Sequence, residues 1–256
     1  MGVNLRNIVN PLKIHLQQLA GRTMAVDAYN ALYQFLSIIR GERGDYLMDK
    51  DGRVTSHLSG LFYRTINLLE LDIKPIYILD GKPPALKIIE IERRQSIKQE
   101  AVKLYMEAIA KGDMEGARKY AQSTSHLKDY MIDDTKKILE LLGIPWIEAS
   151  SDGEATASHL TNINIATDVV SQDFDSLLFG AKRLVRNVTV TGKRKLPGKR
   201  VYVDITPEEI VLENTLGNRG ITREQLVDIG ILLGTDFNPD GFRRVGPTTA
   251  LKYIKK

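Results

Sequence analysis

Short apolar runs that lead to an acidic residue recur along this chain of 256 residues. Three of them are Met24-Ala25-Val26-Asp27, Ile76-Tyr77-Ile78-Leu79-Asp80 and Val169-Val170-Ser171-Gln172-Asp173. Runs of this length are typical of buried strands, and the segments between them have the composition of helices. The alternation predicts an α/β fold with a mostly parallel central sheet flanked by helices. Because ligands collect beyond the carboxyl ends of such strands, we expect the acids to meet at one edge.

Helices are expected at 28–39, 56–70, 128–142, 152–160 and 174–179, and a further strand at 143–148. Segment 87–120 differs, because its many charges leave only a thin apolar stripe, which predicts an exposed helical insertion. The simplest organisation is a single domain in two halves. It is divided into an amino-terminal half at 1–80, an insertion at 81–127, a second half at 128–236 and a last segment at 237–256.

Several local patterns predict structure in the carboxyl-terminal third. Residues 183–190 and 201–205 are expected to form a hairpin around a basic loop. Thr206-Pro207-Glu208-Glu209 is typical of a helix with proline at its first position. Thr222 and Gln225 predict a capping box for a helix that ends near Gly234. Residues 241–256 predict a glycine turn followed by a basic helix.

The composition excludes several classes of protein. No apolar run approaches the ~20 residues of a membrane span, and the first residues lack the apolar core of a secretion signal. The default expectation is therefore a cytoplasmic or nuclear protein without a membrane partner. Cysteine is absent, which excludes disulfides, thiolate metal sites and cysteine nucleophiles.

The charge distribution is more informative than the formal net charge of +4. Segment 181–200 contains eight basic residues and no acid: Lys182, Arg183, Arg186, Lys193, Arg194, Lys195, Lys199 and Arg200. Such a run favours a polyanionic partner. A solvated hairpin is the alternative interpretation of this run taken alone.

Seven acids are candidates for one shared site: Asp27, Asp80, Asp152, Glu154, Asp173, Asp175 and Asp236. Four of them form the acid-x-acid pairs Asp152-Gly153-Glu154 and Asp173-Phe174-Asp175. Residues two apart in a regular helix point ~200° apart around its axis, whereas in extended backbone they share a face. We therefore expect both pairs at strand ends or in the turns that open helices.

That much negative charge in one place requires cations. Oxygen ligands without cysteine or histidine select Mg²⁺, Mn²⁺ or Ca²⁺. Two ions ~4 Å apart would use seven carboxylates and would suit displacement at a phosphodiester. A metal-filled acidic site in a basic protein favours a nuclease. Taken singly, Asp27, Asp80 and Asp236 could be turn residues, and Asp152 and Glu154 could serve a helix dipole.

Longer motifs resemble the flap endonuclease family of archaea and eukaryotes. They are Ala25-Val26-Asp27-Ala28, Tyr33-Gln34-Phe35-Leu36, Thr55-Ser56-His57-Leu58-Ser59-Gly60-Leu61-Phe62-Tyr63-Arg64-Thr65, Leu79-Asp80-Gly81-Lys82-Pro83-Pro84, Ser171-Gln172-Asp173-Phe174-Asp175-Ser176-Leu177-Leu178-Phe179-Gly180 and Leu232-Leu233-Gly234-Thr235-Asp236. The resemblance covers essentially the whole chain. It implies a structure-specific 5′ flap endonuclease with 5′→3′ exonuclease activity, which acts on branched DNA in replication and repair.

The resemblance also implies roles for individual residues. The seven acids would hold two Mg²⁺, for which Mn²⁺ could substitute. Lys87 and Arg94 fall at phosphate-contacting positions of an insertion that looks like the family's helical gateway, or arch. Residues implied in substrate binding are Gly2, Tyr33, Arg40, Thr55, Arg64, Arg243, Arg244, Gly246 and Thr248. Among them, Tyr33 would stack on a base and Thr55 would lie where a short 3′ flap binds.

The segment around Arg243 and Arg244 resembles a helix–hairpin–helix-type turn, with which K⁺ is often associated in the family. Three features depart from the family pattern. Asp152 stands where the family usually has glutamate, and Arg244 where it usually has glycine. The chain also ends within the duplex-binding element, so the expectation is a truncated, monomeric chain without the family's sliding-clamp peptide.

Two further hypotheses stand beside the flap endonuclease. One is a catalytically impaired fragment that binds DNA junctions, because Asp152, Arg244 or the short carboxyl terminus could weaken chemistry. The other is a related repair nuclease with a different preferred junction. The archaeal kind is favoured, which would place the protein in the cytoplasm; a eukaryotic one would be nuclear.

Overall fold

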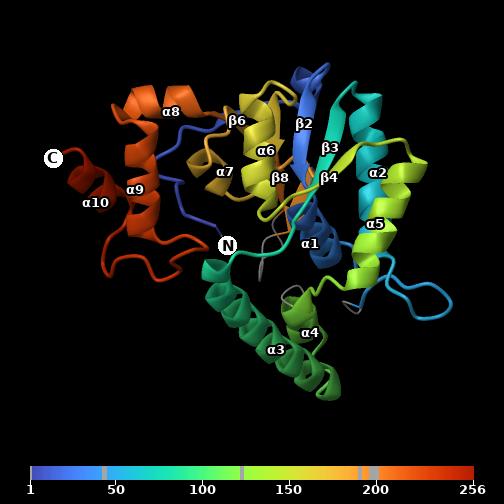
Figure 1. The fold of residues 1–256 in the computed structure, drawn as a ribbon. Coiled ribbons are helices and arrows are strands. Elements are labelled where there is room, and N and C mark those ends of the chain that lie inside the picture. The colour runs from blue at the N-terminus through green and yellow to red at the C-terminus, as the bar shows by residue number, and fades with distance from the viewer. Residues whose placement is uncertain (1, 42–44, 122–123, 190–191, 196–201) are drawn as a thin grey trace.

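A seven-stranded sheet lies at the centre of the molecule (Figure 1). The computed structural model describes residues 2–256 except 42–44, 122–123, 190–191 and 196–201. In sheet order the strands are β1 (Leu12–Lys13), β9 (Glu208–Val211), β6 (Arg183–Arg186), β5 (Asp168–Val170), β2 (Thr23–Asp27), β3 (Lys74–Leu79) and β4 (Trp146–Glu148). The five strands from β6 to β4 are mutually parallel, and β9 and β1 pair antiparallel at the other edge. The predicted α/β class is confirmed.

Helices cover both faces of the sheet, because alternate residues of each strand point to opposite sides. Met24 and Val26 pack with α1 (Ala28–Ile38), α2 (Ser56–Glu70) and α5 (Asp129–Leu141). Ala25 between them packs with α6 (Gly153–Asn162), α7 (Asp175–Leu178) and α9 (Arg223–Leu233) on the other face. The amino-terminal segment, through Leu5 and Ile8, joins this second layer.

The order of the strands places the expected ligand site beside β2. The chain passes from β2 to its neighbour β3, continues to β4, and then crosses to β5 on the other side of β2. In sheets of this kind ligands bind at the carboxyl edge where the winding direction reverses. Asp27, the last residue of β2, therefore lies at the centre of the expected site.

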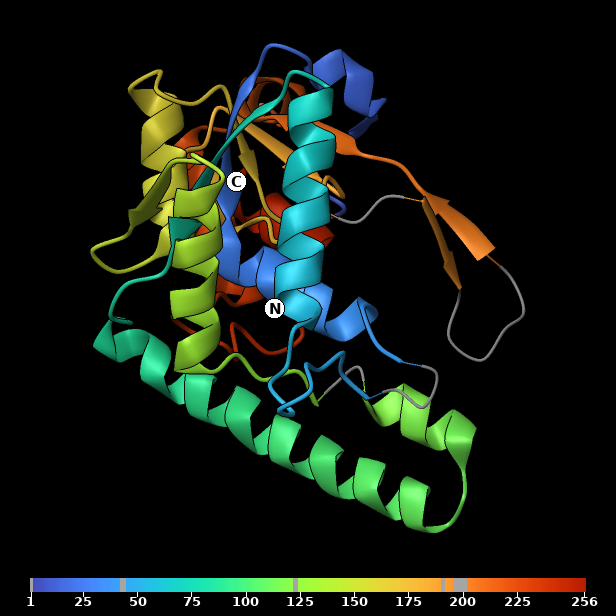
Figure 2. The ribbon, with the colours of Figure 1, turned by 90° about the vertical axis from the view of Figure 1, so that its right-hand side faces the viewer.

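The predicted helical insertion is present at this same edge. It consists of η2 (Ala85–Lys87), the long helix α3 (Ile88–Ala110) and α4 (Met114–Ala121). Only Glu90, Ala101 and Ala108 of α3 are buried, as expected for an exposed helix. Figure 2 shows α3 running across one end of the molecule, with α4 folded back beside it.

Two sequence-based predictions in the carboxyl-terminal third are wrong. Residues 208–211 form strand β9, not the opening of a helix; helix α8 (Leu212–Arg219) begins only afterwards. The sheet overrides the local helix signal here, since β9 pairs with β6 and the carbonyl of Pro207 accepts a hydrogen bond from Ile14 N at 3.0 Å. Ion pairs of Glu209 with Arg22 (2.5 Å) and of Glu208 with Arg186 (3.3 Å) support the strand.

The expected hairpin also differs, because β6 belongs to the main sheet. A separate ribbon pairs β7 (Gly192–Lys195) with β8 (Tyr202–Ile205) and projects from one side of the molecule in Figure 2. Lys199 and Arg200 of the basic run lie outside the described residues. The capping box of Thr222 and Gln225 is confirmed at the start of α9, and α10 (Pro247–Ile254) ends the chain. In the described part of the chain, no helix has the length and apolar character to cross a membrane.

Candidate active site

The carboxyl edge of the sheet carries acids that are held by backbone amides. Asp27 caps α1, and its Oδ1 accepts a hydrogen bond from Asn30 N at 2.9 Å. Asp80 follows β3, and its Oδ1 accepts from Gly153 N at 2.7 Å. Asp152 is the N-cap of α6. The first acid-x-acid pair thus lies in the turn that opens a helix, as its spacing predicts.

The amino-terminal segment contacts the second acid-x-acid pair. Gly2 N donates to Asp173 Oδ1 at 3.2 Å, and Val3 N donates to Asp175 Oδ1 at 2.6 Å. A Cβ atom at Gly2 would lie only 2.6 Å from Asp175 Oδ1, so this position excludes larger residues unless the carboxylate moves. These contacts place Gly2 beside the two acids.

Burial and mutual repulsion raise the pKa of four acids. Burial, followed by the charges of Asp80 and Asp173, raises the pKa of Asp27 well above its usual value. Burial and the charges of Asp27 and Asp175 do the same to the pKa of Glu154. Burial also raises the pKa of Asp80, and it raises that of Asp175 to about 6. Because each acid makes ionisation of the others less favourable, they form one electrostatic unit.

Two cationic side chains of the insertion reach the acids from the other side. Lys87 Nζ forms an ion pair with Asp152 and lies 3.8 Å from Asp236 Oδ2. Arg94 pairs with Asp236, while its Nε donates to Glu90 Oε1 at 2.8 Å. Burial alone would lower the pKa of Lys87, but its hydrogen bond to Asp152 and the negative charges around it outweigh burial and raise it. The insertion therefore neutralises one part of the acidic cluster.

The remaining part of the cluster has no such partner. Within the described residues, no lysine or arginine forms an ion pair with the carboxylates of Asp27, Glu154, Asp173 or Asp175. In the described part of the chain, no group of three acidic or histidine side chains is arranged so that it could hold one metal ion. The donors are all carboxylate oxygens, and the raised pKa values of Asp27, Glu154 and Asp175 indicate a deficit of positive charge around them. They therefore suit hard divalent cations, and the role of the seven acids as metal ligands stays a prediction.

Four residues expected to bind DNA lie on α1, on α2 or between these helices. The Tyr33 ring lies 4.3 Å from Lys98 Nζ, so the insertion packs over it. Arg40 Nε donates to a backbone carbonyl of α1 at 2.8 Å, and Arg64 Nε donates to the Thr189 carbonyl at 2.9 Å. Thr55 immediately precedes α2. Their contacts with DNA stay predictions.

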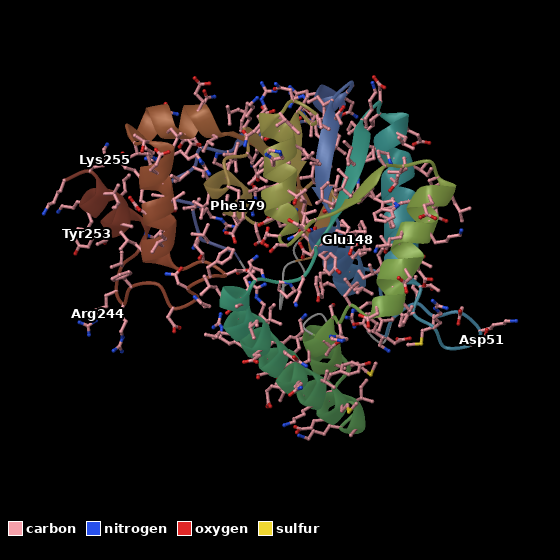
Figure 3. The ribbon with its side chains drawn as sticks, in the orientation of Figure 1. Asp51, Glu148, Phe179, Arg244, Tyr253 and Lys255 are labelled. Atoms are coloured by element: carbon pink, nitrogen blue, oxygen red, sulfur yellow. The ribbon has the colours of Figure 1, made fainter. Side chains whose placement is uncertain are left out.

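The remaining expected DNA contacts lie in the loop before α10 and in its first turn. Arg244 has a φ of 63°, in the left-handed region that favours glycine. This conformation costs a non-glycine residue about 1–2 kcal/mol, a cost that glycine would avoid. Gly246 is the N-cap of α10, and Thr248 lies in its first turn. Figure 3 shows Arg244 at the surface, on the side of the molecule away from Asp51.

Three polar residues that contact this site were not predicted from the sequence to belong to it. Asn30 Nδ2 donates to Asp173 Oδ2 at 3.2 Å, and Ser171 Oγ donates to Glu154 Oε1 at 2.6 Å. Buried Glu90 accepts a hydrogen bond from the guanidinium of Arg94. The spacing of Asn30, three residues after Asp27 at a helix start, was the one available signal.

Family comparisons agree with this geometry. The XPG N-terminal domain family matches residues 1–101, and the XPG I-region family matches residues 143–236. Flap endonuclease 1 of Nitrosopumilus maritimus is 57% identical over 256 residues, which cover 100% of this chain and 75% of that protein. The chain belongs to the flap endonuclease family. A second member, Flap endonuclease 1 of Hyperthermus butylicus, is 56% identical over 258 residues, covering 100% of this chain and 74% of that protein.

Solved structures of similar nucleases share the fold. The flap endonuclease-1 of Methanococcus jannaschii is 40% identical with a TM-score of 0.77, covering 99% of this chain and 77% of that one. The catalytic core of Rad2 in complex with a DNA substrate is 25% identical with a TM-score of 0.70, covering 99% and 68%. Human GEN1 bound to Holliday junction DNA is 25% identical with a TM-score of 0.68, covering 100% and 55%.

Proposed function

We propose that this chain is a structure-specific flap endonuclease that hydrolyses DNA at junctions between single strand and duplex, with 5′→3′ exonuclease activity in replication and repair. The observation that carries the proposal is the acidic cluster at the sheet's carboxyl edge, flanked by Lys87 and Arg94 of the insertion. Identity of 57% to a flap endonuclease 1 across the whole chain supports it.

The seven acids would hold two Mg²⁺, or Mn²⁺ in its place. Such ions supply Lewis-acid polarisation of the scissile phosphate and a hydroxide nucleophile near neutral pH. The protein's own contribution is orientation: backbone amides hold Asp27, Asp80 and Asp175 before any ion arrives. Preformed orientation lowers the entropy cost of assembling the reacting groups.

Lys87 and Arg94 would bind and stabilise the scissile phosphate. Lys87 is paired with Asp152 and Arg94 with Asp236, so a phosphate that binds between the two cations would compete with these acids for them. Arginine offers a planar fork to phosphate oxygens, and lysine a compact point charge. Charge that develops on the phosphate is stabilised by such fixed cations.

Other parts of the proposal concern partners. Branched DNA is the proposed substrate, with duplex phosphates contacted near Arg243 and Arg244, and with K⁺ at the turn before α10. The protein is proposed to act as a monomer in the cytoplasm of an archaeal cell.

One alternative is favoured by specific observations: a fragment that binds junctions but cuts them poorly. Asp152 is one methylene shorter than the usual glutamate, and Arg244 occupies a left-handed position. The likeness to human GEN1 bound to a Holliday junction supports comparison of several junction types.

Cleavage of a labelled 5′-flap substrate in Mg²⁺ tests the proposal. The wild type should cut at the junction, Asp175→Ala should not, and Asp133→Ala, at an exposed acid of α5, should cut normally. Retained flap binding without cleavage in both the wild type and Asp175→Ala would support the impaired fragment instead. Faster cleavage of a bubble or a four-way junction than of the flap would reassign the substrate.

A further inference from the structure

A chain of side-chain hydrogen bonds ends on one carboxylate of the acidic cluster. Thr189 Oγ1 donates to Gln34 Oε1 at 2.9 Å. Gln34 Nε2 donates to Asn30 Oδ1 at 2.5 Å. Asn30 Nδ2 then donates to Asp173 Oδ2 at 3.2 Å. The chain runs from the segment after β6, along about one turn of α1, to the carboxyl edge of the sheet.

Every hydrogen bond in this chain points in the same direction. A carboxylate only accepts hydrogen bonds, so the donor end of the Asn30 amide must face Asp173. Its acceptor end then faces Gln34, whose own donor end must point back along the chain. If the Asn30 amide were reversed, its Oδ1 would oppose a carboxylate oxygen, and both neighbouring hydrogen bonds would be lost.

Asn30 is tied to both central strands of the site. Its backbone N donates to Asp27 Oδ1 at 2.9 Å, at the end of β2. Its Oδ1 also lies 3.4 Å from Gln172 N, which donates to it from the segment after β5. Asn30 therefore contacts the ends of two adjacent strands, β2 through its backbone and β5 through its side chain.

The carboxylate of Asp173 is fixed at both of its oxygens. Gly2 N donates to Oδ1 and Asn30 Nδ2 donates to Oδ2, each at 3.2 Å. Two donors on different oxygens define the plane of the carboxylate, and each oxygen keeps a further lone pair for another ligand. Partners of this kind orient the groups that contact a metal ion.

We propose that Asn30 is a positioning residue for the Asp173 carboxylate, held in the required orientation by Gln34 and Thr189. The proposal rests on the proposed function for its catalytic consequence, but not for its effect on cation binding. The distant end of the chain is anchored, because Thr189 is buried and its carbonyl accepts a hydrogen bond from Arg64 Nε at 2.9 Å. Arg64 thus connects an expected DNA-contact position to the same chain.

The test compares Asn30→Ala and Asn30→Asp with Asn67→Ala, which changes an exposed asparagine of α2. Mn²⁺ affinity is measured by calorimetry without DNA, and flap cleavage by single-turnover kinetics. Loss of a residue that orients a metal ligand typically costs about 10–100-fold in affinity or rate. We expect that loss in both Asn30 variants, flap binding in Ca²⁺ within about 2-fold of the wild type, and no change in Asn67→Ala.

The role of Gln34 is tested by a double-mutant cycle. Gln34→Ala alone should reduce Mn²⁺ affinity less than Asn30→Ala, about 3-fold to 10-fold, because Gln172 N still holds the Asn30 amide. Adding Gln34→Ala to Asn30→Ala should have little further effect. Additive losses would show that Gln34 acts independently and would overturn the chain of positioning contacts.

Wild-type Mn²⁺ affinity and wild-type cleavage in Asn30→Ala would overturn the proposal. Thermal unfolding of each variant separates loss of the fold from loss of orientation; should Asn30→Ala not fold, Gln34→Ala and Asn30→Asp carry the test. If the wild type binds Mn²⁺ but cuts no DNA, while the Asn30 variants bind Mn²⁺ more weakly, the proposed function fails and the positioning role stands.

Discussion

The acidic cluster has two parts that differ in whether cations of the chain neutralise their negative charge. Asp152 and Asp236 are neutralised within the chain, by Lys87 and Arg94 of the helical insertion. Asp27, Glu154 and Asp175 lie deeper, and burial and their neighbours raise the pKa of each. Among the described residues, the insertion supplies cations to the acids on its side, and no lysine or arginine pairs with Asp27, Glu154 or Asp175. Under the proposed function, cations from solution would neutralise these deeper acids.

The geometry suits an exchange of partners on substrate binding. The side chains of Lys87 and Arg94 can leave the acids for a phosphate only if other positive charge neutralises the acids. Divalent cations would do so for both parts of the cluster, and their binding would therefore favour release of Lys87 and Arg94 for DNA.

Replacing Asp27 by asparagine should abolish most cleavage while stabilising the metal-free protein. The carboxylate is buried among other acids, so removing its charge should raise the free energy of unfolding by about 1–3 kcal/mol at pH 8. Loss of a ligand should reduce single-turnover cleavage of a 5′ flap by at least about 100-fold. Denaturant unfolding in EDTA and flap cleavage in Mg²⁺ measure the two effects.

The informative result for Asp27→Asn is that the free energy of unfolding should rise while the cleavage rate falls. Asp72→Asn, a change at an acid outside the cluster, is a suitable control for both assays. A metal-free variant less stable than the wild type would contradict the claim that the deeper acids repel one another.

Replacing Lys87 by alanine should slow cleavage more than it weakens binding. The change leaves Asp152 and Asp236 with less neutralising charge, and it removes the cation that we propose contacts the scissile phosphate. A fixed cation of this kind is worth about 100-fold in rate. Single-turnover kinetics and flap binding in Ca²⁺ separate the two effects, and Lys82→Ala serves as control.

Near-normal single-turnover cleavage by Lys87→Ala would refute a role in stabilising charge on the phosphate. We also expect the metal-free variant to be destabilised, in contrast to Asp27→Asn, because it removes the partner of two acids. The two variants should therefore move the stability of the metal-free protein in opposite directions.

The deeper part of the cluster should make metal binding depend on pH. The pKa of Asp175 is raised from 3.8 to about 6, so folding favours its protonated form. This contribution to the free energy of unfolding is full below pH 3.8 and is lost as the pH rises through about 6. Since a bound cation requires the ionised acid, metal affinity should fall about tenfold per pH unit below the raised pKa.

Calorimetric titration of Mn²⁺ between pH 5 and 8, at about half-unit steps, measures this dependence. A flat affinity over that range would contradict the raised pKa. In Asp175→Asn the remaining pH dependence should be weaker, because one titrating carboxylate is gone.

Replacing Asp152 by glutamate should have the smallest effect on flap cleavage. Asp152 caps α6 and pairs with Lys87, and its carboxylate lies on the side of the cluster that the insertion neutralises. We expect Asp152→Glu to cleave flaps at the wild-type rate or up to about 3-fold faster, within the spread of mild substitutions. A large loss would show that the site is built around the shorter side chain.

Much of this arrangement could be predicted from the sequence, because apolar runs and acid-x-acid spacing are local signals. Asp27 at the end of β2 and Asp152 at the start of α6 lie where the pattern placed them. The strand at Glu208–Val211 could not be predicted, since its stability comes from pairing with β6 and from Arg22 and Arg186, which are distant in sequence.

Two other features could be recognised only in the three-dimensional structure. Neither Asn30 nor Thr189 has a residue type that signals a site, and the hydrogen bond that links Thr189 to Gln34 joins positions 155 residues apart. The pairing of Lys87 and Arg94 with the acids likewise depends on how the insertion packs. Local patterns reveal which residues carry charge, whereas the balance of that charge is a tertiary property.

A crystal structure of the protein at saturating Mn²⁺ tests the central claim most directly. The anomalous signal should reveal two ions ~4 Å apart, bonded to carboxylates that include Asp27, Glu154, Asp173 and Asp175, with Lys87 and Arg94 displaced from their acidic partners. Crystals in which no ion bonds any of these four carboxylates, and in which both ion pairs persist, would contradict it.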